Sequence, residues 1–252
     1  MTSASPAAPD PMDALPPFRR AALMLDMDGT LIDIAPTPDA VIVPSGLPDA
    51  VAALRDALGG ALAIVTGRPI ETVDRLFGDA PGAVAGEHGG AVRRRPGDPV
   101  ERPDLPSPPA SWLQAAETLA GSFPGALLER KARGFALHYR LAPEAGPVFH
   151  AALSALLEGD SGFHLHPAHR LWEVRPLGAD KGGAVVALMQ RPPFSGRLPV
   201  FIGDDVTDED GMREARKLGG AGYRVDAVFG DPEGLRSWLR ASATAGDWAP
   251  LP

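Results

Sequence analysis

Short apolar runs, each closed by polar or glycine residues, recur along the chain and predict the strands of a buried sheet. Three of them are Ala21–Leu25, Ala61–Val65 and Leu198–Ile202. A run of this length that ends in a turn is typical of a strand covered on both faces. Between the first two runs, Leu47–Leu58 has apolar residues at helical spacing and ends at two glycines. Strands that alternate with helices predict a parallel α/β sheet.

Further elements extend this sheet and its helices. They are the strands Ala83–Ala85 and Tyr223–Val225 and the helices Pro69–Phe77, Asp180–Gln190 and Asp231–Ala241. Because ligands bind beyond the carboxyl ends of parallel strands, the residues that follow each strand are the candidates for a site.

A different pattern fills the middle of the chain, after a stretch rich in proline and charge at residues 96–109 that is typical of a linker. It predicts a small open sheet with helices on one face. Its elements are Trp112–Leu119, Ala126–Lys131, Phe135–Arg140, Glu144–Leu157, Phe163–His166 and Arg170–Arg175. We therefore expect a core domain of residues 19–95 and 176–242, an inserted domain of residues 96–175, a mobile leader at 1–18 and a mobile tail at 243–252.

Strand parity divides the side chains of the small sheet between two faces, because alternate residues point in opposite directions. Phe135, Leu137 and Tyr139 share one face and are expected to pack on the helices. The other face is expected to be polar, either as a solvated surface or as a binding surface for a polyhydroxylated ligand. The polar set is Glu129, Lys131, His138, Arg140, Glu173 and Arg175. His164, His166 and His169 also lie in this region, but no acidic partner is evident, so we do not assign them a metal.

Composition narrows the class of protein. The chain has 252 residues, 44% of them hydrophobic, no cysteine and a net charge of −8. These values allow a large buried core, exclude disulfides and thiolate chemistry, and argue against a general nucleic-acid binder. No apolar run is long enough to cross a membrane, and the first 18 residues lack the pattern of a secretory signal. We therefore expect a cytoplasmic protein with no membrane association.

Asp26 and Asp28 directly follow the first strand and place two carboxylates side by side. At this spacing they repel each other, so a cation or a shared proton is expected between them. Mg²⁺ fits, because it prefers oxygen ligands and the chain has no cysteine. Polar clusters also follow the second and the later strand or open a helix. They are Thr66–Arg68, Lys181, and the acidic set Asp204, Asp205 and Asp208.

Each cluster alone has a structural explanation as a turn or a cap; Thr207 and Asp210, for example, have the spacing of a capping box. Their common position at one edge of a sheet instead predicts a shared anion site, where the Thr66 turn and Lys181 would face a negatively charged ligand.

The motifs D-M-D-G-T, T-G-R, Lys181 and G-D-D-V-T-D resemble, in order and spacing, those of the haloacid-dehalogenase-like (HAD) phosphatases. The segments G-E-H-G-G-A, E-R-K, E-V-R-P and D-K-G are similar to those of the trehalose-6-phosphate phosphatase family. The resemblance covers residues 21–240. It implies a Rossmann-like HAD core with an inserted α/β cap of type C2, and a sugar phosphate as substrate.

The resemblance also implies a role for each site residue. Asp26 would be the nucleophile, Asp28 the general acid and base, Thr66 a phosphoryl ligand and Lys181 the balancing charge. Mg²⁺ would be held by Asp26, Asp28 through its backbone carbonyl, and Asp204. Asp205 and Asp208 would support these groups or orient Lys181, and Arg68 would be structural. The substrate-binding set would be Glu87, His88, Glu129, Lys131, His138, Arg140, Glu173 and Arg175.

Other functions remain open at this stage. One is a phosphatase for sucrose phosphate or a glucosylglycerol-type phosphate, which only the inserted domain distinguishes. Another is a sugar phosphomutase, which would return the phosphoryl group to a sugar. A non-catalytic sensor is disfavoured because Asp26 and Asp28 are both present. The nearest expectation is a monomeric, Mg²⁺-dependent trehalose-6-phosphate phosphatase of trehalose biosynthesis.

Overall fold

The computed structural model describes residues 14–35, 40–102, 104–131, 133–160, 162–168, 170–178 and 180–252. The chain divides into two compact units. The core unit comprises Met1–Arg102 and Asp180–Pro252, and the small unit comprises Pro103–Ala179. These junctions lie a few residues later in the chain than the bounds predicted from the sequence, which place the inserted domain at residues 96–175. Among the described residues, no helix is long and apolar enough to cross a membrane.

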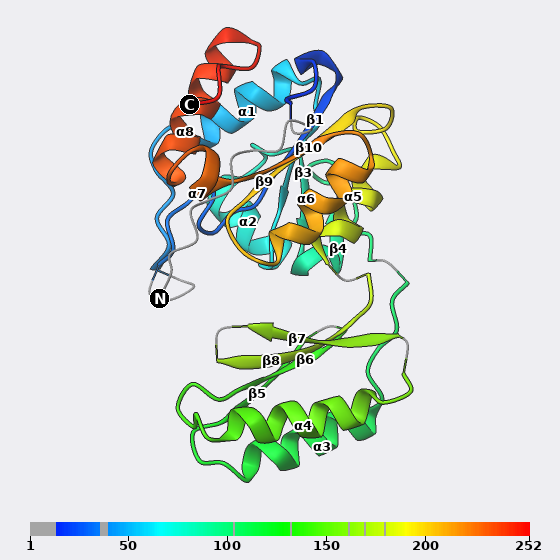
Figure 1. The fold of residues 1–252 in the computed structure, drawn as a ribbon. Coiled ribbons are helices and arrows are strands. Elements are labelled where there is room, and N and C mark those ends of the chain that lie inside the picture. Colours follow the sequence, from blue (N-terminus) through cyan, green and yellow to red (C-terminus); the bar gives the residue numbers. More distant parts are fainter. Residues whose placement is uncertain are drawn as a thin grey trace. The chain divides into compact units, whose positions relative to one another are not determined.

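The core unit is built on a six-stranded sheet in the order β10-β9-β1-β2-β3-β4 (Figure 1). All neighbouring pairs are parallel except β3 and β4. The strands are β1 (Ala21–Leu25), β2 (Leu62–Val65), β3 (Ala83–Gly86), β4 (Ala91–Arg93), β9 (Leu198–Gly203) and β10 (Ala221–Arg224). Every residue of β1 and β2 is buried, as expected for strands covered on both faces.

Helices cover both faces of this sheet (Figure 1). On one face, Leu23 and Ile64 share a core with α1, α2 and α8, and on the other, Met24 and Phe201 pack with α5 and α6. The helices are α1 (Leu47–Ala57), α2 (Ile70–Phe77), α5 (Lys181–Met189), α6 (Asp208–Lys217), α7 (Val225–Val228) and α8 (Pro232–Ala245), with short 3-10 turns at Phe18–Arg20 and Glu87–Gly89. The doubly covered parallel sheet is the predicted fold class.

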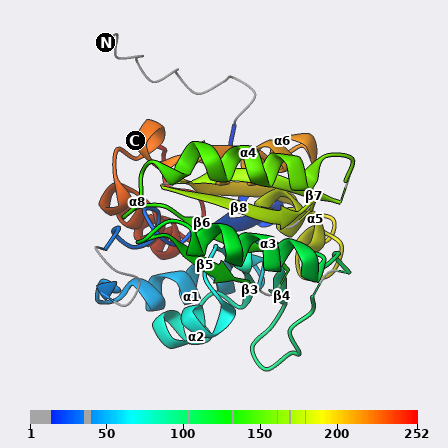
Figure 2. The ribbon, with the colours of Figure 1, turned by 90° about the horizontal axis from the view of Figure 1, so that it is seen from below.

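The small unit is an antiparallel sheet in the order β5-β6-β8-β7, with two helices on one face. Its elements are α3 (Ala110–Gly121), β5 (Leu127–Arg130), β6 (Phe135–His138), α4 (Ala145–Leu157), β7 (Phe163–Ala168) and β8 (Leu171–Pro176). Figures 1 and 2 show α3 and α4 running side by side along this sheet. The predicted face assignment is confirmed: Phe135 and Leu137 lie in the core shared with both helices, and the partly buried Tyr139 packs against it.

The prediction of a mobile tail is wrong. Helix α8 continues to Ala245, and Trp248 stacks on Trp238 with ring centroids 5.4 Å apart. Trp248 also meets Phe18 edge-on and donates from Nε1 to the Pro16 carbonyl over 2.8 Å. Both ends of the described chain are therefore fastened to the core. The predicted leader overlaps the described residues only at 14–18, and there Phe18 is buried rather than mobile; residues 1–13 lie outside them.

Candidate active site

Lys181 lies between two buried carboxylates at the centre of the site. Its Nζ donates to Asp26 Oδ1 over 2.7 Å and to Asp208 Oδ1 over 2.6 Å. Asp26 is the first residue after β1, and Lys181 begins α5, where Asp180 caps the helix by accepting from the Gly183 N–H. Lys181, Asp26 and Asp208 are all less than 5% exposed. The structure thus joins three of the predicted motifs within hydrogen-bond distance.

Asp208 also organises the loop that follows β9. Its Oδ2 accepts from the backbone N–H groups of Asp204 and Asp205, over 3.1 and 3.0 Å. The predicted capping box of Thr207 and Asp210 is wrong, because the Thr207 side chain makes no capping hydrogen bond. The Asp208 carboxylate binds the loop instead. Asp205 is exposed, and its own carboxylate accepts from the Val206 N–H.

Asp204 meets the loop after β1 at close range. Thr30 Oγ1 donates to Asp204 Oδ1 over 3.1 Å. A Cβ atom at Gly29, where φ is +79°, would lie 2.2 Å from Asp204 Oδ2, so this position has no room for a side chain. The contact between the two loops therefore depends on glycine at position 29.

The electrostatics show an excess of negative charge. Burial lowers the pKa of Lys181, but the charges of Asp26 and Asp208 outweigh it and raise that pKa above its ordinary value. Burial and then the charge of Asp26 raise the pKa of Asp204 to about 6 and the pKa of Asp208 to about 7. One buried cation does not balance three neighbouring carboxylates, so a further cation would stabilise the site.

The donor set fits Mg²⁺. Among the described residues, one group of potential ligands was found, consisting of Asp26, Asp204 and Asp208, with one oxygen of each within 4.8 Å of the others. Oxygen donors from carboxylates are those that Mg²⁺ prefers. The set predicted from the sequence consists of Asp26, Asp204 and the backbone carbonyl of Asp28, and that carbonyl remains a predicted ligand. The Asp28 carboxylate binds Arg68.

Arg68 is the residue that sequence reasoning missed, since it was expected to be only structural. Its guanidinium donates from Nε and Nη2 to the two carboxylate oxygens of Asp28, each over 2.7 Å. Its backbone N–H donates to Thr66 Oγ1 over 3.2 Å. The T-G-R turn after β2 thus contacts the loop after β1, and Arg68 links Thr66 with Asp28. Only its position two residues after Thr66, beyond a strand end, could have drawn attention to it.

Glu87 and His88 lie beside the same turn. Their backbone N–H groups donate to the carbonyls of Arg68 and Thr66, each over 3.0 Å. Both residues have φ near +55°, a conformation uncommon outside glycine, and the His88 ring lies against Gly67. Glu87 accepts from Arg102 with both oxygens. The structure therefore brings His88 to the candidate anion site and pairs the Glu87 carboxylate with an arginine.

Most of the predicted polar residues of the small unit do gather on the open face of its sheet. Lys131 Nζ donates to Glu173 Oε1 over 2.6 Å, and His138 Nε2 lies 2.7 Å from Glu129 Oε2. Arg140 is an exception: β6 ends at His138, and Arg140 lies exposed in the following turn.

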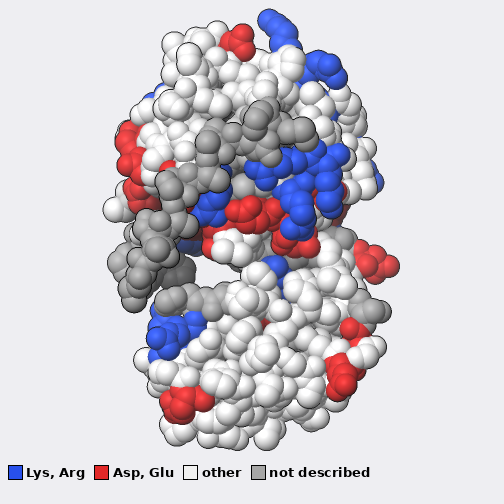
Figure 3. Space-filling view, in the orientation of Figure 1, with Lys and Arg blue, Asp and Glu red and all other residues white. Residues whose placement is uncertain are grey.

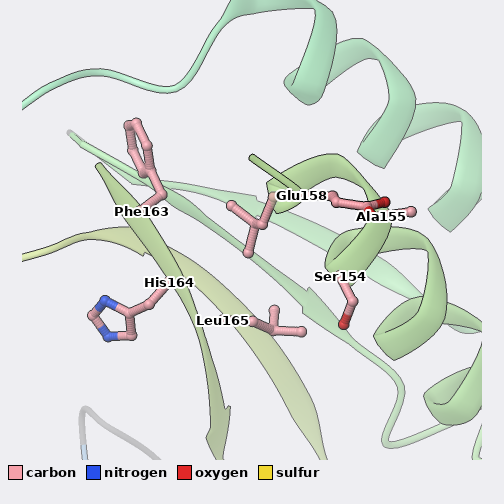
Figure 4. A pocket seen from close by; sticks show the side chains of 7 residues that line it. Ser154, Ala155, Glu158, Phe163, His164 and Leu165 are labelled. Carbon is pink, nitrogen blue, oxygen red and sulfur yellow. The ribbon is translucent and has the colours of Figure 1, made fainter. Parts of the chain in front are cut away.

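Arg175 extends this polar face. It donates to His164 Nε2 over 2.9 Å and lies 3.2 Å from His166 Nδ1. Figure 4 shows a shallow hollow between α4 and β7, toward which Leu165 points, while His164 points to the other side of the strand. His164 and His166 are thus partners of an arginine on the open face. His169 lies outside the described residues.

The comparison with known sequences decides the family. A family model described as trehalose-phosphatase matches residues 24–234. The chain belongs to this trehalose-phosphatase family. A relative from Sinorhizobium fredii, named probable trehalose-phosphate phosphatase, is 42% identical over 91% of this chain and 87% of its own length. The trehalose-6-phosphate phosphatase of Escherichia coli is 35% identical over 89% and 87%.

Solved structures agree on the fold of this trehalose-phosphatase family member. The trehalose-6-phosphate phosphatase of Aspergillus fumigatus has a TM-score of 0.69 at 23% identity, over 90% of this chain and 93% of that one. A haloacid dehalogenase-like hydrolase from Bacteroides thetaiotaomicron has a TM-score of 0.63 at 13% identity, over 88% and 98%. At these identities the likeness shows the fold, a haloacid-dehalogenase-like core that carries an inserted α/β unit.

Acidic and basic side chains lie close together on part of the surface of this trehalose-phosphatase family member. Figure 3 shows acidic and basic side chains lying side by side along the lower edge of the core unit in that view. Among the ion pairs of the core unit, Arg102 donates to both oxygens of Glu87, and Arg94 contacts Glu101. These two arginines are thus engaged by neighbouring carboxylates.

Proposed function

We propose that this chain is a Mg²⁺-dependent phosphatase that hydrolyses trehalose 6-phosphate to trehalose and inorganic phosphate. The single observation that supports this most is the buried Lys181, which donates both to Asp26, just after β1, and to Asp208, at the start of α6. Family membership and the printed names of the relatives support the substrate.

The reaction proceeds in two displacements at phosphorus. In the first, an Asp26 oxygen forms a bond to phosphorus while the bond from phosphorus to the sugar oxygen breaks, and Asp28 gives that oxygen its proton. In the second, Asp28 takes a proton from water, the water oxygen bonds to phosphorus, and Asp26 is released with inorganic phosphate. Thr66 and Lys181 bind the phosphoryl oxygens throughout, which holds the reacting groups in line.

Asp26, Asp204 and the backbone carbonyl of Asp28 would hold Mg²⁺, and Asp208 lies close enough to contribute. When bound, the ion neutralises charge on the phosphoryl oxygens and reduces their repulsion from the nucleophile. Asp205 supports the loop that carries Asp204, and Asp208 orients Lys181.

The open face of the small sheet is proposed to bind the disaccharide. Its paired donors and acceptors, Lys131 with Glu173 and His138 with Glu129, suit a ligand with many hydroxyl groups. Glu87, His88, Arg140 and Arg175 are further candidates for the substrate-binding set. The cap subtype C2 and the roles of these residues are part of the proposal.

A panel of phosphate esters tests the substrate. With Mg²⁺ and the full chain, phosphate release from trehalose 6-phosphate should exceed that from glucose 6-phosphate, sucrose 6-phosphate and glucosylglycerol phosphate by at least about tenfold in kcat/KM. Equal values across the panel would remove the substrate assignment. A phosphomutase would instead isomerise a sugar phosphate without accumulating phosphate, which the same assay detects.

The nucleophile is tested by Asp26→Asn, which should lower turnover by at least about a thousandfold. Asp56→Asn is the matched control, because Asp56 lies on α1 and only pairs with Arg55. Turnover by Asp26→Asn close to that of the unchanged chain would contradict the mechanism.

Partners and compartment complete the proposal. The acidic balance of the chain supports a small-molecule substrate and no nucleic-acid partner. We place the enzyme in the cytoplasm and expect it to be a monomer. Size-exclusion chromatography with light scattering tests the oligomeric state directly.

A further inference from the structure

Arg224 fastens three segments around Asp204. From the end of β10, its Nη2 donates to the Asp204 carbonyl oxygen over 2.6 Å. Its Nη1 donates to Glu209 Oε1 over 3.1 Å, and its Nε donates to Asp226 Oδ1 over 3.0 Å. Glu209 belongs to the first turn of α6 and Asp226 to α7. One side chain therefore connects the loop after β9 with α6 and α7.

The position of the Asp204 carboxylate depends on the Asp204 main chain, whose carbonyl accepts a hydrogen bond from Arg224. On its other side, the carboxylate is limited by the bond from Thr30 and by the close approach of Gly29. A hollow lined by Gly29, Asp204 and Asp226, among others, lies beside it. The Asp204 N–H donates to Asp208 Oδ2 and the Asp204 carbonyl accepts from the Arg224 guanidinium, so Arg224 holds the carbonyl side of this residue. A shift of this carbonyl would change the position of the carboxylate.

We propose that Arg224 is a positioning residue that sets the Mg²⁺ affinity of the site by holding the main chain of Asp204. This inference rests on the proposed function, because it takes Asp204 as a metal ligand. Groups that orient a metal ligand commonly change metal affinity by about 10- to 100-fold when they are removed. Arg224 acts in this way from outside the ligand set and touches neither metal nor substrate.

The sign of the effect separates positioning from simple electrostatics. Removal of a positive charge near a cation site strengthens cation binding if charge alone matters. Removal of a positioning contact weakens it, because Asp204 is then less well placed. Arg224→Gln therefore distinguishes the two causes by direction. Arg224→Lys keeps the positive charge but loses the guanidinium, whose N–H groups reach three acceptors at once. If Arg224 acts by positioning, this variant should therefore also bind Mg²⁺ more weakly.

Isothermal titration of the full, metal-free chain with Mg²⁺ is the test. We expect Arg224→Gln and Arg224→Lys to raise the Mg²⁺ dissociation constant about tenfold. The Mg²⁺ concentration for half-maximal phosphate release should rise in parallel, and the rate should recover as Mg²⁺ is raised. Arg216→Gln is the matched control, because Arg216 Nη2 donates to a backbone carbonyl, that of Gly222, over 2.7 Å. Its dissociation constant should stay within about twofold.

Unchanged or tighter Mg²⁺ binding by Arg224→Gln would overturn the proposal, as would an equal weakening in Arg216→Gln, which would indicate general loosening of the core. If Arg224→Gln does not fold, Arg224→Lys decides by the same criterion. A wild-type chain that neither binds Mg²⁺ nor releases phosphate with it would overturn the proposed function and this inference together. If the wild-type chain binds Mg²⁺ and releases phosphate with it, and the Arg224 variants bind Mg²⁺ equally well, this inference alone is overturned.

Discussion

The Arg68 guanidinium donates to both carboxylate oxygens of Asp28, from Nε to Oδ2 and from Nη2 to Oδ1, each over 2.7 Å. Each Asp28 oxygen therefore accepts a hydrogen bond from a positively charged group, and the two bonds together fix the direction in which the carboxyl group points. Under the mechanism proposed above, in which Asp28 protonates the leaving sugar oxygen, Arg68 would set the direction of that acid.

Arg68→Lys should reduce turnover more for a substrate whose leaving group needs a proton than for one whose leaving group does not. Lysine keeps the charge but loses the two-pronged geometry, so Asp28 is placed less well. We expect phosphate release from trehalose 6-phosphate, whose sugar oxygen needs a proton, to fall about tenfold or more. Release from p-nitrophenyl phosphate, which needs no protonation, should fall less than about threefold. Arg213→Lys, at an exposed pair with Asp210, is the control, and equal losses on both esters would contradict this role.

Glu173→Gln should affect the disaccharide and spare a simple ester. Glu173 is 6% exposed and accepts from Lys131, so the change removes a charged acceptor from the open face of the small sheet. We expect KM for trehalose 6-phosphate to rise about tenfold, with KM for p-nitrophenyl phosphate within about twofold. Glu117→Gln, at an exposed pair with Arg130 in the same unit, should leave both values unchanged. A uniform loss on both esters would point to damage to the unit as a whole.

Stabilisation by Mg²⁺ should grow as the pH rises. The pKa values of Asp204 and Asp208, about 6 and about 7, lie above the ordinary value of 3.8. Protons bound there stabilise the folded chain at low pH, and this contribution is lost as the pH rises from about 4 through 7. Mg²⁺ competes with those protons. We expect the increase in Tm caused by Mg²⁺ to be at least about twice as large at pH 8 as at pH 5.

Calorimetry at matched ionic strength measures this effect, with NaCl replacing MgCl₂ in the control. The same increase in Tm at every pH between 5 and 8 would show that no proton is displaced. That result would indicate that Mg²⁺ binds at exposed acidic residues and not at the buried carboxylates.

Trp248→Ala should destabilise the core unit although Trp248 lies in the segment expected to be mobile. The substitution removes the stack on Trp238, the edge contact with Phe18 and the bond to Pro16. Since Trp248 is only partly buried, we expect the free energy of unfolding to fall by about 2 kcal/mol, less than for a fully buried tryptophan. Urea denaturation measures it. Leu251→Ala is the control. An unchanged urea midpoint in Trp248→Ala would support the original prediction that the tail is mobile.

The sequence was sufficient to predict the elements that carry the motifs. Asp26, Thr66 and Asp204 each follow an apolar run, and the rule that parallel strands end at one edge placed them together. Lys181 donates directly to Asp26 and joins it to Asp208, as the positions of Lys181 and Asp208 at helix starts allow. Local pattern and topology carried this part of the prediction.

Contacts between loops could not be predicted in this way. The pairing of Arg68 with Asp28 depends on two side-chain directions in separate turns, which no periodicity encodes. Strand β4 was missed because three residues after a glycine pair become a strand only by pairing with β3. The capping box failed because Asp208 is held by tertiary hydrogen bonds that outweigh a local motif. The contacts of the tail could not be predicted for the same reason, because Trp248 packs on Trp238 and Phe18.

The place of β9 in the core sheet has a consequence for synthesis on the ribosome. Ala21 of β1 pairs with Leu198 of β9, and the entire small unit lies between them in the chain. The small unit contains all four strands of its own sheet, so it can fold while the later segment is still being translated. The core sheet stays open along β1 until that segment emerges. Premature termination after residue 179 would therefore leave a finished insert joined to an exposed, aggregation-prone strand edge.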